Sequence, residues 1–172
     1  MIPKFAICGC ILLLLSASPA TTQSDDGGCA PPTEGCRLNL DTEKPQFAIG
    51  EPIDLRVSLH NVSRDKVRTG SLAYLGCRIE VLLPNGKPAP LTLWGEKLIH
   101  PMWVSAGSNT IELYRGEVWD EELRDLNRAF DMTLSGKYMI TVHRMVTSSS
   151  DPEKLVDVPS NKIKVELHDP EQ

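Results

Sequence analysis

A stretch of strict alternation between apolar and polar residues, residues 53–60, is the strongest constraint on the fold. Turn-forming residues stand on both sides of it, with Gly50-Glu51-Pro52 before and Asn61 after. Successive side chains of a β-strand point to opposite faces, so this pattern predicts a strand with one buried and one solvated side. We therefore expect a sheet whose inner face receives Ile53, Leu55, Val57 and Leu59.

Short alternating segments of the same kind recur to the end of the chain, separated by turn residues. The chain has neither a fixed-period repeat nor an alternation of strand and helix patterns. Residues 119–130 differ, because their apolar side chains recur at helical spacing and predict a short helical insertion. The sequence therefore predicts an all-β fold, an antiparallel sandwich of about seven or eight strands. The predicted core consists of Leu38, Leu40, Ile53, Leu55, Val57, Leu59, Ile79, Val81, Ile111, Leu113, Tyr138, Ile140, Val142, Ile163 and Val165.

The Asn85-Gly86 pair predicts a tight hairpin turn, because both residue types tolerate the positive φ angles that such turns need. Residues 91–94 are the expected returning strand. Pro88 and Pro90 confine that strand to the edge of a sheet, since proline has no N–H to donate to an inner ladder.

The first twenty residues predict an export signal. Lys4 is followed by an apolar run over residues 5–15 and by the small-residue end Ser18-Pro19-Ala20. The run is too short to span a bilayer as a stable helix, although a retained anchor is the alternative. We expect cleavage after Ala20, a flexible leader over residues 21–36 and one domain over residues 37–168. The product is predicted to be secreted or periplasmic, with no stable membrane span.

Three of the five cysteines remain after such cleavage: Cys29, Cys36 and Cys77. In an oxidising compartment two of them are expected to pair. We favour a Cys29–Cys36 disulfide because these two are nearest in sequence, and Cys36–Cys77 stays open as the alternative. The third thiol is then either buried or linked to another chain.

Charge and motifs argue against several functions. The net charge of −5 becomes −6 once Lys4 leaves with the signal, and no basic cluster is present, which argues against binding nucleic acid or an anionic membrane. Neither a Gly-x-Ser-x-Gly elbow nor a glycine-rich phosphate loop occurs. The acidic run of residues 117–125 is interleaved with arginines, which favours a solvated helix face over a catalytic pair. We expect a protein that is not an enzyme and holds no cofactor.

Two binding alternatives rest on particular side chains. The pairs His100/Met102 and His143/Met145 offer imidazole and thioether groups, a ligand set that suits Cu(I), so an extracytoplasmic copper carrier is one alternative. The other is a carbohydrate-binding module in which Trp94 and Trp103 stack on sugar rings.

Several short motifs follow one another along the chain in an order that it shares with a known class of domains. An aromatic residue, Phe47, precedes Gly50-Glu51-Pro52 and a strand that ends in Asn61; Gly136-Lys137-Tyr138 and Ser160-Asn161 then precede two later strands. In this order the chain resembles bacterial exported immunoglobulin-like β-sandwich domains. The resemblance covers most of residues 37–167 and implies an immunoglobulin-like fold, whereas it implies no particular function.

The strand that starts at Tyr138 suggests where a partner binds. Its predicted outer side carries uncharged and polarisable side chains, which is unusual for a solvated surface. Methionine side chains are flexible and adapt well to the shape of a partner. We therefore predict a non-catalytic binding or assembly module that engages a protein partner. The predicted contact residues are Met139, Thr141, His143 and Met145.

Overall fold

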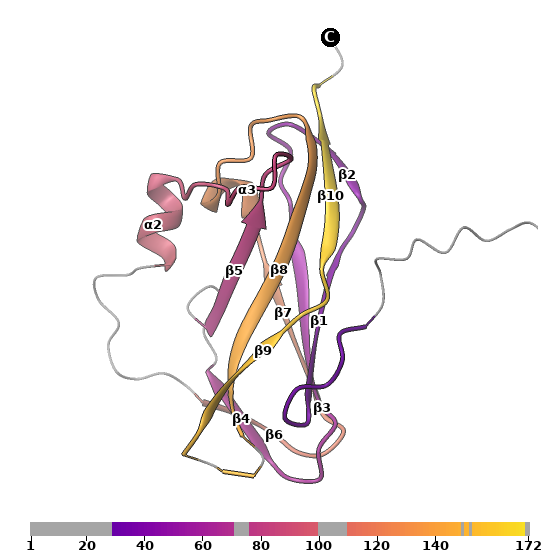
Figure 1. The fold of residues 1–172 in the computed structure, drawn as a ribbon, viewed down its shortest axis with the longest axis vertical. Helices are drawn as coiled ribbons and strands as arrows, with labels where there is room; N and C mark the ends of the chain where they lie inside the picture. Colours follow the sequence, from indigo (N-terminus) through magenta and orange to yellow (C-terminus); the bar gives the residue numbers. More distant parts are fainter. Residues whose placement is uncertain (1–28, 71–75, 100–109, 149, 152, 171–172) are drawn as a thin grey trace, which may run out of the picture.

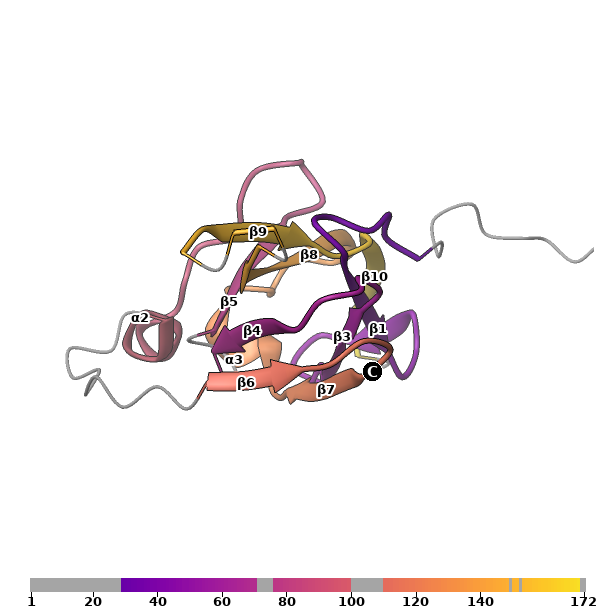
Figure 2. The ribbon, with the colours of Figure 1, turned by 90° about the horizontal axis from the view of Figure 1, so that it is seen from below.

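The computed structural model describes residues 29–70, 76–99, 110–148, 150–151 and 153–170. Two β-sheets pack face to face in this part of the chain (Figures 1 and 2). The first sheet has three strands in the order β1-β3-β7. These strands are β1 (Cys36–Thr42), β3 (Leu55–Asn61) and β7 (Val118–Leu123).

The second sheet is organised around β8 (Gly136–Thr147). Its main path runs β2-β10-β8-β4-β6, and both β5 and β9 also pair with β8. The registers place β4 and β5 along one side of β8 and β9 and β10 along the other. The remaining strands are β2 (Gln46–Ala48), β4 (Val67–Gly70), β5 (Cys77–Leu82), β6 (Thr110–Leu113), β9 (Leu155–Pro159) and β10 (Ile163–His168).

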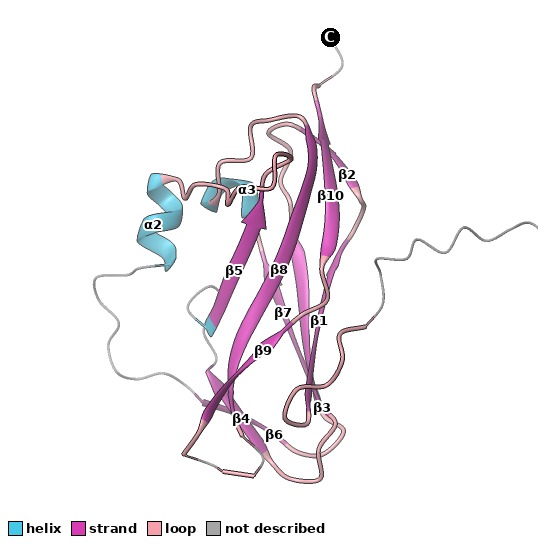
Figure 3. Ribbon diagram, viewed as in Figure 1, coloured by secondary structure: helices cyan, strands magenta, loops and turns pink. Residues whose placement is uncertain are grey.

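The predicted fold class is confirmed: the described residues form a mostly antiparallel, immunoglobulin-like β-sandwich. They contain ten strands rather than seven or eight, and β2 pairs with β10 in the parallel sense. The described residues include two short helices, α2 (Leu93–Ile99) and α3 (Leu126–Ala129), beside one end of the sandwich (Figure 3). Within the described ranges, we find no helix with the length and apolarity needed to cross a bilayer.

The core lies between the two sheets, as the alternation predicts. Leu55, Val57 and Leu59 of β3 are completely buried, while the residues between them face outward or are only partly covered. Burial of a side chain of this size contributes about 1.5–3 kcal/mol relative to exposure. Every other member of the predicted core is also buried, except Ile111 and Ile163, which are partly buried and pack against it.

The helix predicted over residues 119–130 is mostly wrong. Residues 118–123 form β7, which pairs with β3 in antiparallel register from His60↔Val118 to Leu55↔Leu123. Only Leu126–Ala129 is helical. Trp119 and Leu123 are four residues apart, a spacing that also puts them on the same side of a strand, so the apolar pattern did not separate the two structures.

The hairpin turn is confirmed, whereas its returning strand is not. Gly86 has φ +78° and donates to the carbonyl of Leu83 at 2.8 Å. Residues 91–94 form no strand. Instead, the Thr92 hydroxyl accepts from the N–H of Gly95 at 3.0 Å, an N-cap contact that starts α2.

The expected Cys29–Cys36 disulfide is not formed, and neither is the alternative pair. Cys29, Cys36 and Cys77 are free cysteines. Two backbone bonds between Thr33 and Cys36, of 2.7 and 2.9 Å, close a turn that leads into β1, and the Cys36 side chain lies in the core. Cys29 is exposed, so the two sulfurs have different surroundings. Burial raises the pKa of the Cys36 thiol to about 11.

Candidate functional site

The outward side of β8 forms the centre of a polar surface. His143 lies opposite Arg78 of β5 and Pro159 of β9, and Met145 lies opposite Asp157. Because side chains alternate along each strand, these residues share the outer side of the second sheet. We call this surface the outer face; it is made of Arg78, Glu80, Leu82, Met139, Thr141, His143, Met145, Leu155 and Asp157.

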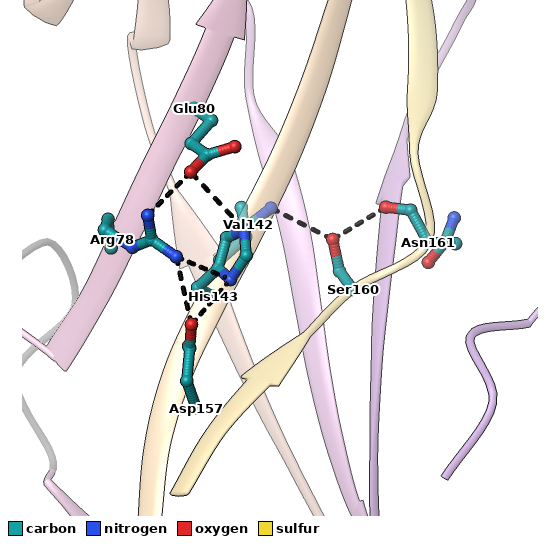
Figure 4. Close-up of polar contacts among 7 residues, drawn as sticks. All are labelled: Arg78, Glu80, Val142, His143, Asp157, Ser160 and Asn161. Atoms are coloured by element: carbon teal, nitrogen blue, oxygen red, sulfur yellow. Dashed lines mark hydrogen bonds and ion pairs between the residues drawn. The ribbon is translucent and has the colours of Figure 1, made fainter. Parts of the chain in front are cut away.

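A hydrogen-bonded charge cluster occupies the middle of the outer face (Figure 4). Arg78 donates to Glu80 at 2.7 Å and to Asp157 at 3.0 Å, and so joins β5 to β9 across β8. The Nδ1 atom of His143 lies 3.0 Å from both Asp157 Oδ2 and Arg78 Nη2, and its Nε2 lies 3.7 Å from Glu80 Oε1. The imidazole is thereby held from both sides, with only 15% of its side chain exposed.

A β-bulge between β9 and β10 fixes the position of Asp157. Two residues of β8 lie between Ile140 and His143, whereas three lie between their partners Pro159 and Ile163, so the second segment has one extra residue. Ser160 accepts from the N–H of Val142 at 3.0 Å and donates to the carbonyl of Asn161 at 2.7 Å (Figure 4).

The side chain of Asn161 then connects this bulge to the other sheet. Its Oδ1 accepts from the N–H of Leu40 at 2.7 Å, and its Nδ2 donates to the carbonyl of the same residue at 2.9 Å. The side-chain amide of Asn161 thus forms the two backbone hydrogen bonds that a neighbouring strand would otherwise form with β1. The Ser160-Asn161 motif of the sequence is therefore a structural joint that holds β9 beside β8.

The predicted contact residues differ in accessibility. Met145 is 45% exposed, Met139 and His143 are partly buried, and Thr141 is only 9% exposed. Sequence reasoning missed Arg78, Glu80 and Asp157, which approach His143 only through strand pairing. The one available signal was the alternation in β5, which places Arg78 and Glu80 on the solvated side.

The copper alternative involves only two described residues, since His100 and Met102 lie outside the described part of the chain. His143 and Met145 share the outer face, but the imidazole Nδ1 is already engaged by Asp157 and Arg78. Across the described ranges, no group of three or more His, Cys, Asp or Glu side chains is arranged to hold a metal ion.

The carbohydrate alternative is also described only in part, because Trp103 lies outside the described residues. Trp94 is on α2 and is 37% exposed. The guanidinium of Arg128 lies 5.1 Å from the centre of its ring, within the range of a cation–π contact. One face of this indole is therefore occupied by the protein's own arginine.

A second charged group lies inside the sandwich. Arg144, the residue between His143 and Met145, is completely buried and points into the core. It donates to Glu121 Oε2 at 2.9 Å, to Thr69 Oγ1 at 2.9 Å and to the carbonyl of Gly70. Its guanidinium also lies 3.9 Å from the centre of the Trp119 ring.

Burial controls the ionisation of the groups around Arg144. It raises the pKa of the Glu121 carboxyl, while the hydrogen bond and charge of Arg144 act in the opposite direction. Burial also raises the pKa of the Cys77 thiol to about 11, although Arg144 Nη1 lies 3.1 Å from its sulfur. A thiol with so high a pKa stays protonated at neutral pH and is a poor nucleophile. The bond from Arg144 of β8 to Glu121 of β7 links the two sheets in the interior. The expectation that Glu121 lies on a solvated helix face is wrong.

A shallow depression of about 250 Å³ lies at one end of the first sheet. Carboxylates predominate among the described residues that line it, and Arg56 is the one cation among these. The residues that line it are Asp41, Thr42, Glu43, Asp54, Leu55, Arg56 and Glu122.

The similarities of this chain to known proteins are remote and structural. No family model matches the chain, and no curated protein matches it. Among solved structures, it is similar to a structural genomics target called SoR45, with 10% identity, a TM-score of 0.48 and coverage of 83% of this chain and 97% of that one. For the C-terminal domain of wzt, the identity is 14% and the TM-score is 0.45, with coverage of 80% of this chain and 75% of that one. For the PapD-like domain 7 of human CEP192, the identity is 12% and the TM-score is 0.43, with coverage of 98% of this chain and 100% of that one.

Proposed function

We propose that this chain is an exported, non-catalytic binding or assembly module that engages a protein partner through the outer face. The observation that carries the proposal is the distribution of exposed apolar side chains. Leu82 is 36% exposed, Met145 45% and Leu155 61%, and all three border the charge cluster on the same side of the sheet. Export is proposed from the first twenty residues.

This arrangement matches the usual anatomy of a protein interface. Apolar and soft side chains provide contact area, and methionine adapts to the shape of a partner. Arg78 supplies the residue type that most often contributes strongly to such contacts. Its bonds to Glu80 and Asp157 hold it in place before a partner arrives, which lowers the entropy cost of binding.

The cluster is better suited to recognition than to proton transfer. Both carboxylates beside His143 already accept hydrogen bonds from Arg78, so they are engaged in holding the cluster together. Salt bridges of this exposed kind contribute only about 0.2–1 kcal/mol each to folding. The ordered geometry therefore has a small effect on stability and a larger one on the shape of the surface.

A photo-crosslinking experiment tests the proposal. A photoreactive amino acid is placed at Met145 in the full chain, and a matched control carries it at Tyr114, which is 58% exposed and lies beyond β6. After irradiation in the native compartment, we expect a discrete adduct from position 145 that is absent from position 114. Adding Arg78→Glu or Leu155→Glu should reduce that adduct at least fivefold.

The proposal is wrong if position 145 gives no discrete adduct, or if both positions give the same one. Circular dichroism and the thermal midpoint of each variant confirm that the fold is retained, so that a lost adduct reports on the outer face.

A further inference from the structure

The two edges of the first sheet are treated differently. The free side of β1 is covered: Leu40 bonds to the side chain of Asn161 through both backbone groups, and Leu38 forms a bridge with Ser160. The start of the strand is closed by the backbone bonds between Thr33 and Cys36. Described residues therefore cover the free side of β1 at Cys36, Leu38 and Leu40.

On its other side, β7 pairs with no described strand. The N–H of Asn61 donates to the carbonyl of Glu117 at 3.0 Å, and this sets the phase of the ladder between β3 and β7. In an antiparallel pair, hydrogen-bonded and non-bonded residue pairs alternate. It follows that the backbone groups of Val118, Asp120 and Glu122 point away from β3.

These three residues are exposed, and no described residue forms a hydrogen bond with their backbone groups. Each offers one donor and one acceptor in the spacing of a strand. The inward charge of Glu121, which would discourage pairing at an edge, is neutralised by Arg144 at 2.9 Å. The edge of β7 is therefore a template for one more strand.

Charge selects among the strands that β7 could accept. A second copy paired antiparallel about Asp120 would place one Asp120 opposite the other, and like charges directly opposite are destabilising. The chain's own ends are also acidic, with Asp25 and Asp26 in the leader and Asp169 and Glu171 at the C-terminus. The depression beside Glu122 adds the carboxylates of Asp41, Glu43 and Asp54. Arg56 lines the depression and Arg124 pairs with Glu122, but the carboxylates outnumber these two arginines, so the charge still favours a cationic occupant.

We propose that the edge of β7 binds an extended segment of a partner protein that carries Lys or Arg at alternate positions, and that this segment becomes the fourth strand of the first sheet. Main-chain bonds to Val118, Asp120 and Glu122 supply the pairing. The alternate cations lie across from Asp120 and Glu122 and reach toward the depression. This surface is separate from the outer face, so the two proposals stand independently.

Peptide binding to the full chain tests the proposal. The probe is a seven-residue peptide of sequence Thr-Lys-Val-Lys-Val-Lys-Thr with blocked ends, and its Glu-for-Lys counterpart is the control. Hydrogen exchange followed by NMR should show the amides of Val118, Asp120 and Glu122 becoming at least tenfold more protected with the Lys peptide. We expect the Glu peptide to leave them unchanged.

Two further variants separate pairing from charge. Asp120→Pro removes an N–H that points to the open edge and leaves the ladder to β3 in place, so it should weaken binding at least tenfold. Asp120→Asn keeps the N–H and should weaken binding less, with a smaller dependence on salt. Methylating the alternate peptide amides that face β7 should abolish binding, whereas methylating the other set should not.

The proposal is overturned if the three amides gain no protection, if the Glu peptide binds as tightly as the Lys peptide, or if both methylated peptides behave alike. The methylated peptides act on the unaltered protein, so this outcome does not depend on whether Asp120→Pro folds.

Discussion

Arg144 of β8 and Glu121 of β7 form an ion pair across the interior of the sandwich, with 2.9 Å between Nη1 and Oε2. The arginine side chain is completely buried and the glutamate side chain is 10% exposed. Additional bonds to Thr69 and Gly70, and the Trp119 ring 3.9 Å away, surround the guanidinium. The pair links the two sheets within the core.

Removing one member of this pair should destabilise the fold strongly. Glu121→Ala leaves the buried guanidinium of Arg144 without its counter-ion, and we expect a loss of about 3–5 kcal/mol in the free energy of unfolding. The double variant Arg144→Met/Glu121→Leu removes both charges and should recover most of that loss. Urea denaturation measures both values. The matched control is Arg124→Met, which breaks an exposed pair with Glu122 and should cost less than about 1 kcal/mol.

The same glutamate should make stability depend on pH. Burial raises the folded-state pKa of Glu121 above its ordinary value of 4.5, so folding favours the protonated carboxyl. That contribution is fully present below the ordinary value and is lost as pH rises through the raised folded pKa. Glutamine does not titrate. The stability of the natural protein minus that of Glu121→Gln should therefore decrease as the pH rises above the ordinary value of 4.5. A difference that stays flat or increases would contradict the raised pKa.

The three cysteines of the described domain should react very differently with a thiol reagent. Cys29 is exposed, whereas Cys36 and Cys77 are buried and their pKa values are raised to about 11 by burial. With iodoacetamide at neutral pH, peptide mapping should find Cys29 modified in the folded protein and all three modified in denaturant. Recovery of a Cys29–Cys36 peptide linked by a disulfide would show that the free thiols described here are not the final state.

Asn61 should be a structural residue rather than a glycan acceptor, although Asn61-Val62-Ser63 matches the N-glycosylation pattern. Its side chain is completely buried, and Nδ2 donates to the carbonyls of Asp65 at 2.8 Å and Leu113 at 2.9 Å. Asn61→Ala should therefore lower the free energy of unfolding by about 2–4 kcal/mol, measured by urea denaturation. Ser63→Ala removes the pattern and should cost less. A folded chain exposed to the glycosylation machinery should gain no mass.

Much of the fold follows from short-range patterns in the sequence. The alternation in β3, β5 and β8 correctly predicts the buried residues, because alternate side chains of a half-buried strand face the core. The Gly136-Lys137-Tyr138 motif is explained by the Tyr138 hydroxyl, which donates to the carbonyl of Leu134 at 2.8 Å and accepts from its N–H at 3.1 Å. Such a tyrosine corner is a recurrent feature of immunoglobulin-like sandwiches.

Features that depend on distant residues were not predictable in this way. Arg78, Glu80 and Asp157 meet His143 only because two strands flank β8, and nothing local to any of them signals the encounter. The alternation along β8 places Arg144 on the inward side. Its buried charge makes sense once Glu121 is known to lie beside it, and the sequence pattern predicts a helix at Glu121 instead of a strand that faces Arg144. The cysteine pairing failed for a similar reason, since nearness in sequence does not fix the direction of a side chain.

The extra residue at Asn161 sets a limit on how this chain can vary in length. Because of it, the even-numbered residues face inward in β9, whereas the odd-numbered residues Ile163, Val165 and Leu167 face inward in β10 and their neighbours face outward. Deleting one residue from the Ser160-Asn161-Lys162 joint would exchange those two sets, placing Lys164 and Glu166 in the core and Leu167 in water. Homologous chains should therefore tolerate insertions and deletions between β8 and β9 but keep this joint at constant length.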